Sequence, residues 1–289
     1  MRVNPPRRKR KLSVAIPASI ISDTPHLREK TSKIGMIGRA LAIFRVEEAI
    51  IYPDRLEIDQ RREANLIATI LSYMETPQYM RKRIFKLRPE LRYAGILPPL
   101  RTPHHPTDSR SEDLKVGELR EGITIRRVKR GTLIDIGVEK PALMPKLWIK
   151  AGIRVTVKIT EIGRQIKAKP ISQNEITTYW GYKVTVSKSP LGRMVKERGF
   201  NLIIATSRWG DPIKDLMEKL AKDWKSSRSI LIAFGSPTRG LRDILAQEGI
   251  KIEDFAHYII NTIPNQATET VRTEEALYTT LSILNLIED

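Results

Sequence analysis

The chain of 289 residues contains no cysteine and only four histidines. The absence of cysteine excludes disulfide bonds, thiolate zinc sites and cysteine nucleophiles. The neighbours His104 and His105 cannot face one metal ion from a single side of a helix, so we expect no bound metal. No run of about 18 apolar residues occurs, which predicts no membrane span. The basic N-terminus lacks the apolar stretch of a secretory signal, and we therefore expect a soluble, cytoplasmic protein.

Acidic residues are also few. The chain has 33 Asp and Glu against 51 Lys and Arg, a formal net charge of +18. Such an excess attracts polyanions, so nucleic acid is the first expected partner and an anionic membrane surface the second. The basic segment 1–11 contains Arg7, Arg8, Lys9 and Arg10. It is interpreted either as a solvated, disordered tail or as an arm that contacts RNA, and a disordered arm can also fold on nucleic acid.

Strand and helix patterns alternate in the first part of the chain. Short apolar runs at 11–16 and 49–52 predict buried strands, and apolar residues at helical spacing predict helices at 27–45 and 59–75. This alternation favours an α/β fold with a parallel sheet. A proline-rich stretch at 88–106 then marks a boundary.

Residues 107–174 show short strand patterns and no helix. Several of these strands alternate apolar with basic or polar residues, so one face would be core and the other positive. The pattern predicts a small β-barrel of the OB type that binds RNA, with Arg126 and Arg127 as contacts. An ordinary β-domain with a solvated face is the alternative. The expected strands are 122–128, 132–137, 153–159 and 165–169.

The alternation of strand and helix returns after residue 175. The sequence therefore predicts three parts: a basic flexible arm at 1–11, an inserted barrel at 107–174, and a discontinuous α/β domain formed by 12–106 and 175–289. Expected strands of this second half lie at 182–187, 202–206, 229–234 and 257–261.

Three of the later strands each end in a loop of small and polar residues. These loops are 206–212, 235–240 and 261–272. Ligands of open α/β sheets bind outside the carboxyl ends of the strands, so we expect the three loops to form one site. Gly235 and Gly240 would allow tight turns and a close approach of backbone to ligand. Neither a Walker loop nor a G-x-G-x-x-G motif occurs.

The same loops carry a family resemblance. The most specific motif is NTIPNQ at 261–266 followed by TVRTEEA at 270–276; others are YAGILPPL at 93–100, PHH at 103–105, YWGY at 179–182, ATSR at 205–208 and FGS at 234–236. Together they resemble the archaeal and eukaryotic branch of SPOUT-class RNA methyltransferases with an inserted OB-like domain. The resemblance covers nearly all of the chain after the basic arm.

This resemblance implies a trefoil-knotted parallel sheet with helices on both faces, a homodimer, and S-adenosyl-L-methionine as the methyl donor. It also implies a base of ribosomal RNA as acceptor, with uridine N3 as the first candidate. Asn265 stands where many members have glycine and tolerates a left-handed backbone, whereas Ala267 does so less easily. The cofactor-binding residues implied by the resemblance are Thr206, Phe234, Gly235, Gly240, Asn261, Thr262, Ile263, Gln266 and Thr270.

Methyl transfer needs an acceptor in line with the methyl group and a dry, correctly shaped site. A uridine ring nitrogen must also lose its proton, and a positive group would stabilise the developing anion. Arg208 and Arg272 lie in suitable loops and are the catalytic candidates; bracing of the loops is the alternative role. His104 and His105 either order a turn or serve the RNA, by contact or by proton transfer.

Two glutamates begin the last helix. With Thr273 as the expected N-cap, Glu274 and Glu275 would interact favourably with the helix dipole. Contact with substrate is the alternative. The sequence thus predicts a SAM-dependent RNA methyltransferase. Two other hypotheses remain: a non-catalytic RNA-binding or ribosome-assembly protein on a degenerate methylase scaffold, and a DNA-binding protein.

Overall fold

The computed structural model describes residues 4–287. The chain divides into two compact units, each built from segments far apart in the sequence. The sheet unit comprises 8–74, 89–99 and 182–287, and the barrel unit comprises 4–7, 75–88 and 100–181. Among the described residues, no helix is long and apolar enough to cross a membrane.

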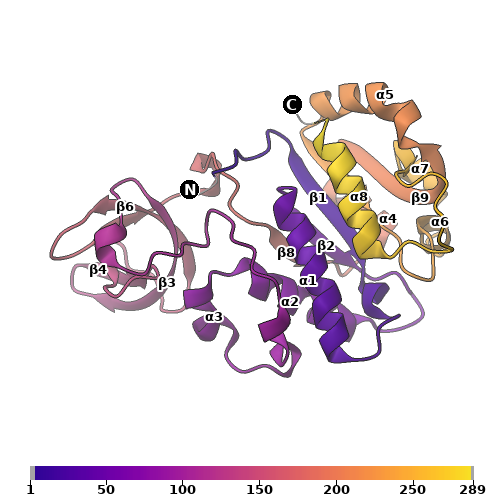
Figure 1. Cartoon of the computed structure of the whole chain (residues 1–289). Coiled ribbons are helices and arrows are strands. Elements are labelled where there is room, and N and C mark those ends of the chain that lie inside the picture. The colour runs from indigo at the N-terminus through magenta and orange to yellow at the C-terminus, as the bar shows by residue number, and fades with distance from the viewer. Residues whose placement is uncertain (1–3, 288–289) are drawn as a thin grey trace. The chain divides into compact units, whose positions relative to one another are not determined.

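The sheet unit contains a six-stranded parallel sheet in the order β11-β9-β10-β1-β2-β8 (Figure 1). Its central strands β1 and β10 are buried on both faces. Their sequences accordingly do not alternate between apolar and polar residues. The predicted parallel α/β architecture is confirmed. The strands are β1 (Lys11–Pro17), β2 (Glu48–Tyr52), β8 (Lys183–Val186), β9 (Leu202–Pro212), β10 (Ser229–Ala233) and β11 (Tyr258–Asn261).

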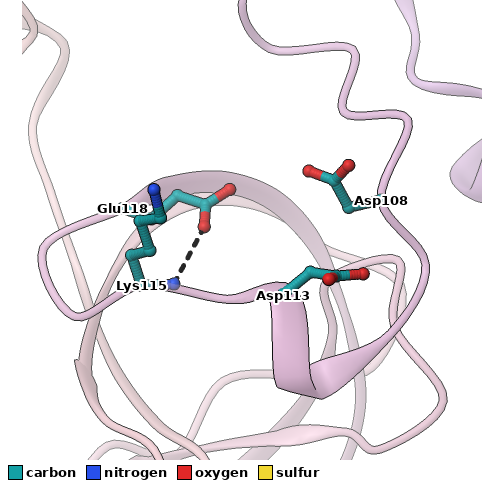
Figure 2. Close-up of a pocket in the computed structure, with 4 residues that line it drawn as sticks. All are labelled: Asp108, Asp113, Lys115 and Glu118. Carbon is teal, nitrogen blue, oxygen red and sulfur yellow. Dashed lines mark hydrogen bonds between the residues drawn. The ribbon is translucent and has the colours of Figure 1, made fainter.

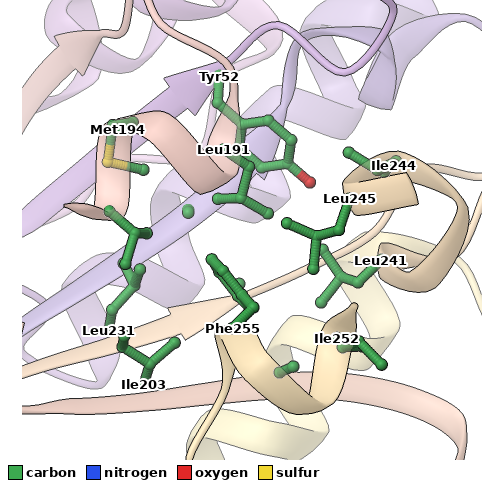
Figure 3. Packing of buried hydrophobic residues seen from close by; sticks show 14 of the residues in the cluster. Tyr52, Leu191, Met194, Ile203, Leu231, Leu241, Ile244, Leu245, Ile252 and Phe255 are labelled. Atoms are coloured by element: carbon green, nitrogen blue, oxygen red, sulfur yellow. The ribbon is translucent and has the colours of Figure 1, made fainter. Parts of the chain in front are cut away.

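Helices cover both faces of this sheet. On one face, α4, α6 and α7 share a core with Ala15, Ile50, Leu231 and other residues of alternate strand positions (Figure 3). On the other face, α1 and α8 pack side by side (Figure 1). The helices of this unit are α1 (Leu27–Ile43), α2 (Arg61–Glu75, its last residue in the barrel unit), α4 (Leu191–Arg198), α5 (Ile213–Ser226), α6 (Leu241–Ala246), α7 (Ile252–Phe255) and α8 (Thr273–Asn285).

The barrel unit contains a closed barrel of five strands in the order β3-β4-β5-β7-β6. All strand pairs are antiparallel except β5 with β7. Ile134, Met144 and Val157 belong to its apolar core. The helix α3 (Gln78–Phe85) and the 3-10 turn Ser111–Asp113 also belong to this unit. The strands are β3 (Leu119–Val128), β4 (Gly131–Asp135), β5 (Ala142–Pro145), β6 (Arg154–Glu161) and β7 (Lys167–Pro170).

The expected flexible arm is wrong for residues 4–11. Pro6 forms a β-bridge with Thr178, and strand β1 begins at Lys11. Arg8 is only 5% exposed and donates hydrogen bonds to the Phe44 carbonyl and to Asn285 Oδ1. Residues 1–3 of the predicted arm lie outside the described residues.

Arg7 and Arg10 are also engaged by the protein, each through a backbone carbonyl. Arg7 donates to the Gln173 carbonyl at 2.8 Å, and Arg10 donates to the Lys225 carbonyl at 2.7 Å. Lys9 is exposed. Because its guanidinium is buried and bonded, Arg8 is removed from the predicted RNA contacts, whereas Arg7, Lys9 and Arg10 stay predictions.

The histidine pair has a structural role. The Nε2 atoms of His104 and His105 lie 2.8 and 2.7 Å from the backbone carbonyl of Glu75. A carbonyl can only accept, so both Nε2 atoms carry hydrogen. His104 is buried, which removes it from the predicted RNA contacts. Burial and the neighbouring His104 together lower the pKa of His105 to about 3, so its imidazole is neutral at physiological pH.

Glu75 is the centre of a polar network in the barrel unit. Arg154 donates to both Glu75 carboxylate oxygens, at 2.6 and 2.9 Å, and to Glu121 Oε2 at 2.6 Å. Trp180 donates its indole N–H to Glu121 Oε1 at 2.5 Å. Burial would raise the pKa of Glu75, but hydrogen bonds from His104 and Arg154 outweigh it and lower the pKa to about 2. The network therefore holds an ionised, buried carboxylate.

Acid is expected to remove the stabilisation that Glu75 provides. The pKa of this group is 4.5 in its ordinary state and about 2 when folded, so the unfolded chain binds the proton more readily. At 1.36 kcal/mol per pKa unit the contribution is about 3 kcal/mol. It is complete above pH 4.5 and is lost as the pH falls toward 2. Urea unfolding of wild type and Glu75→Gln across this range should show a stability difference that narrows in acid; a difference independent of pH would contradict the assignment.

Candidate functional site

The candidate site begins with an interruption in strand β9. Ala205 pairs with Ile259 of β11, but the next β11 residue, Ile260, pairs with Asp211. Residues 206–210 therefore bulge out of the ladder at the carboxyl end of the sheet. Gly210 closes the bulge, because a Cβ at this position would lie 2.6 Å from the Ile259 carbonyl oxygen. The bulge turns polar side chains toward the loops that follow β10 and β11.

A cavity of about 500 Å³ lies among these three segments. It is formed entirely by residues of the sheet unit, from the β9 bulge, the loop between β10 and α6, and the loop between β11 and α8. The three loops that the sequence singled out thus converge on one cavity. Its lining includes all the residues predicted to bind the cofactor: Thr206, Phe234, Gly235, Gly240, Asn261, Thr262, Ile263, Gln266 and Thr270.

Asn261 joins two of these loops. Its Nδ2 donates to the Arg208 carbonyl at 2.8 Å, and its Oδ1 accepts from the Ile263 N–H at 2.9 Å. The first bond ties β11 to the β9 bulge, and the second makes the tight turn that starts the last loop. Asn265 is left-handed, with φ 58°, a conformation that asparagine tolerates, and Ala267 is not among the residues of positive φ. The loop path therefore requires no glycine at 267.

Arg208 braces the mouth of the cavity. Its Nη1 donates to the Glu269 carbonyl at 2.6 Å, and its guanidinium lies 4.7 Å from the centre of the Trp209 ring. Gln266 also donates to the backbone of this loop, at Thr268 and Glu269. A positive charge is thus held at a fixed place on the cavity wall, so loop bracing and a role toward the ligand are compatible for Arg208.

The loop after β10 is held by a hydrogen bond from β2 and by hydrogen bonds within the loop. Tyr52 donates its hydroxyl to the Phe234 carbonyl at 2.6 Å, and Ser236 N–H donates to the Arg239 carbonyl at 2.9 Å. A Cβ on Gly235 would lie 3.0 Å from the Arg239 carbonyl oxygen, so the turn itself favours glycine here. Gly240 has more space, since the nearest atom to an added Cβ is Asp243 Oδ2 at 3.8 Å.

Arg272 is not among the residues that line the cavity. It is exposed and occupies the N-cap position of α8, whereas the expected N-cap, Thr273, is the first residue of the helix. Glu275 accepts a hydrogen bond from the Arg272 N–H at 2.9 Å, and Glu274 lies 3.5 Å from Lys33 Nζ. These contacts support the structural role of both glutamates.

Trp209 was not selected as a site residue from the sequence, although it lies within the predicted loop 206–212. It lines the cavity and is 81% exposed. Trp209 directly follows Ser207 and Arg208, which line the same cavity. Its exposure would have marked it as a site residue, but exposure cannot be read from the sequence. His105, Arg126 and Arg127 belong to the barrel unit and are not part of this cavity.

A second cavity of about 520 Å³ lies in the barrel unit, lined by Asp108, Asp113, Lys115 and Glu118 (Figure 2). The Lys115 backbone N–H donates to Glu118 Oε2 at 3.1 Å. Three carboxylates against one amine would repel phosphate groups. This cavity is therefore a poor candidate for an RNA contact.

Comparisons with known proteins identify the family. The model of a family described as "Putative RNA methyltransferase" matches residues 11–284. An uncharacterized protein of Haloarcula marismortui is 34% identical over 96% of this chain and 99% of its own length. The 28S rRNA (uridine-N(3))-methyltransferase of Drosophila melanogaster is 32% identical over 94% of this chain and 61% of its own length. The human protein of the same name is 30% identical over 94% of this chain and 77% of its own length.

The family match extends from the first strand of the sheet to the last helix, and so includes every loop of the cavity. The chain therefore belongs to this RNA methyltransferase family and is a methyltransferase enzyme.

Proposed function

We propose that the protein transfers a methyl group from S-adenosyl-L-methionine to a base of ribosomal RNA, with uridine N3 as the first candidate. One observation carries the proposal: the residues selected as cofactor contacts line one cavity at the carboxyl end of a parallel sheet. The acceptor is inferred from the names of the Drosophila and human relatives.

The cavity suits such a cofactor in size and chemistry. Its volume of about 500 Å³ lies within the range of small-molecule sites. Gly235 and Gly240 leave backbone accessible, and Thr206, Asn261 and Thr262 provide polar groups. Asp243 and Glu269 also line it and could balance a positively charged ligand. When bound, S-adenosylmethionine supplies a methyl group on a positively charged sulfur.

The protein's own residues would contribute mainly position and charge. Asn261 fixes the β11 loop against the bulge, so the cavity walls need not rearrange when a ligand binds. Arg208 places a guanidinium at the mouth, where it would stabilise negative charge developing on a uracil ring. Arg272 remains a second candidate for RNA phosphate at the start of α8. No described residue is assigned as the base.

We assign RNA binding to the barrel unit. Its strand order and size support an OB-type barrel, an architecture that binds oligonucleotides. Arg126 and Arg127 are exposed on β3, next to its turn into β4. The excess of 51 basic over 33 acidic residues supports a polyanionic partner.

We also propose a trefoil knot and a homodimer. The position of β11 at the edge of the sheet, followed by the return of α8 to pack on α1, supports a threaded path for the last segment. Met36 and Ile43 lie two turns apart on α1 and are both exposed, which supports an apolar contact with a second copy. Sedimentation analysis of wild type and a Met36→Glu, Ile43→Glu double variant would test the dimer.

Titration calorimetry of the full chain with S-adenosylmethionine tests the proposed function directly. We expect stoichiometric binding, and transfer of a labelled methyl group to ribosomal RNA, with the modified nucleoside identified by mass spectrometry. A folded protein that bound no S-adenosylmethionine would overturn the proposed donor. Methylation at a different atom would overturn only the uridine N3 assignment.

Substitution of Asn261 is expected to weaken cofactor binding in two steps. Asn261→Asp keeps the acceptor for the Ile263 N–H but directs a carboxylate at the Arg208 carbonyl, so affinity should fall about tenfold. Asn261→Ala loses both bonds and should bind more weakly still. Asn201→Asp is the matched control, because the Asn201 Oδ1 acts as an acceptor, for Arg228 and Ser229, outside the cavity. If calorimetry gave the same S-adenosylmethionine affinity for all three variants, the two hydrogen bonds of Asn261 would not be needed for cofactor binding.

A further inference from the structure

The barrel unit carries an exposed tryptophan that the proposed function does not yet use. Trp148 is 55% exposed and lies in the segment 146–153, which connects β5 to β6. Its neighbours Leu147 and Ile149 pack against the barrel core. Because successive side chains of an extended segment alternate, burial of these two directs Trp148 outward.

The backbone around Trp148 is fixed to the β3–β4 hairpin. Thr132 Oγ1 donates to the Leu147 carbonyl at 2.6 Å and accepts from the Ile149 N–H at 2.9 Å. Thr124 Oγ1 donates to the Lys150 carbonyl at 2.6 Å. These two threonines are buried, so each supplies bonds that water cannot easily replace. The tryptophan therefore stands on a rigid support.

The ring itself is oriented by the hairpin. Its Nε1 donates to the Val128 carbonyl at 3.3 Å, which uses the only hydrogen-bond donor of the indole. What remains for a ligand is the apolar π-surface. Such a surface, held in place before binding, loses little conformational entropy when a flat group stacks on it.

The hairpin and the segment that carries Trp148 are rich in exposed basic residues. Six exposed basic residues lie on the hairpin and on the segment that carries Trp148, and within the described part of the chain none of them forms an ion pair with a carboxylate. Such cations are available to phosphate groups. They are Arg126, Arg127, Lys129, Arg130, Lys146 and Lys150.

We propose that Trp148 and these six residues form a platform for unpaired RNA, with one base stacked on the indole and the flanking phosphates held by the cations. The proposal rests on RNA being the substrate. It specifies a single-stranded segment because a base within a duplex has no free face to offer, whereas sequence-tolerant binders of single strands combine a basic groove with aromatic stacking.

The test is fluorescence anisotropy of a labelled oligouridine and of a duplex of equal length, with the full chain at one fixed salt concentration. Trp148→Ala should bind the single strand about tenfold more weakly, the effect of losing one stacked base. Trp148→Phe should retain most of the affinity. Both variants lose the bond to the Val128 carbonyl, so their difference isolates the ring. Stacking should also quench the tryptophan fluorescence of a Trp209→Phe variant, in which Trp148 is the exposed indole.

Salt dependence separates the two parts of the platform. Arg126→Ala should reduce the slope of log affinity against log salt by about 0.7, the value for one phosphate contact on a single strand, whereas Trp148→Ala should leave the slope unchanged. Equal binding by wild type and Trp148→Ala, or a preference for the duplex, would overturn the proposal. Preference for single-stranded DNA would also overturn it. Cofactor binding by the same proteins, measured separately, reports on the proposed methyl transfer. Failure of the RNA platform proposal would therefore not imply failure of the proposed methyl transfer, or the reverse.

Discussion

A Gly240→Val variant is expected to bind S-adenosylmethionine at least about a hundredfold more weakly than the wild-type protein, equivalent to roughly 2.7 kcal/mol. Gly240 lines the cavity, and its backbone angles, φ −71° and ψ 165°, suit any L-residue. The nearest atom to an added Cβ is 3.8 Å away, so the protein itself can accommodate the side chain. The valine methyl groups would instead occupy space that the cofactor needs. Titration calorimetry measures the loss.

Gly95→Val is the matched control for this experiment. Gly95 is exposed in the same unit, no atom lies within 4 Å of an added Cβ, and it does not line the cavity. Both variants should unfold at the same urea concentration as wild type, and only Gly240→Val should lose the ligand. Gly235 is a poorer choice, because its added Cβ would press on the Arg239 carbonyl oxygen at 3.0 Å. Undiminished binding by Gly240→Val would place the cofactor elsewhere.

Glu75→Ala is expected to reduce the free energy of unfolding by about 3–5 kcal/mol at neutral pH, as removal of one partner from a buried ion pair does. The substitution leaves Arg154 with Glu121 as its remaining carboxylate partner and leaves buried His104 without its contact to the Glu75 carboxylate, 3.2 Å away. Neither group can be fully rehydrated in the folded state, so the loss exceeds that of a surface pair.

The control for Glu75 is the exposed pair of Arg110 and Glu112 in the same unit, whose side chains are 75% and 70% exposed. Glu112→Ala should change the free energy of unfolding by about 1 kcal/mol or less. Urea unfolding followed by circular dichroism compares the two variants. If Glu75→Ala were as stable as Glu112→Ala, the Glu75 network would have no structural importance.

The element types were largely predictable because they depend on local periodicity. Mainly apolar runs at 11–16 and 229–234 became the central strands β1 and β10, and the helical spacing at 27–45 became α1. The converging loops were also predictable, because strands of a parallel sheet end at a common edge. The path of β9 was not, since its bulge depends on the pairing of Ala205 and Asp211 with residues of β11 far along the chain.

The sequence by itself determined the parallel α/β architecture, the basic charge and the three loops that form the cavity. Only the tertiary structure decided which charged and aromatic groups remain accessible. Arg8 is buried by Phe44 and Asn285, and Trp148 is exposed because its two neighbours face the barrel core. The physical reason is that periodicity acts between neighbours in sequence, whereas burial of a side chain depends on partners that only folding brings together.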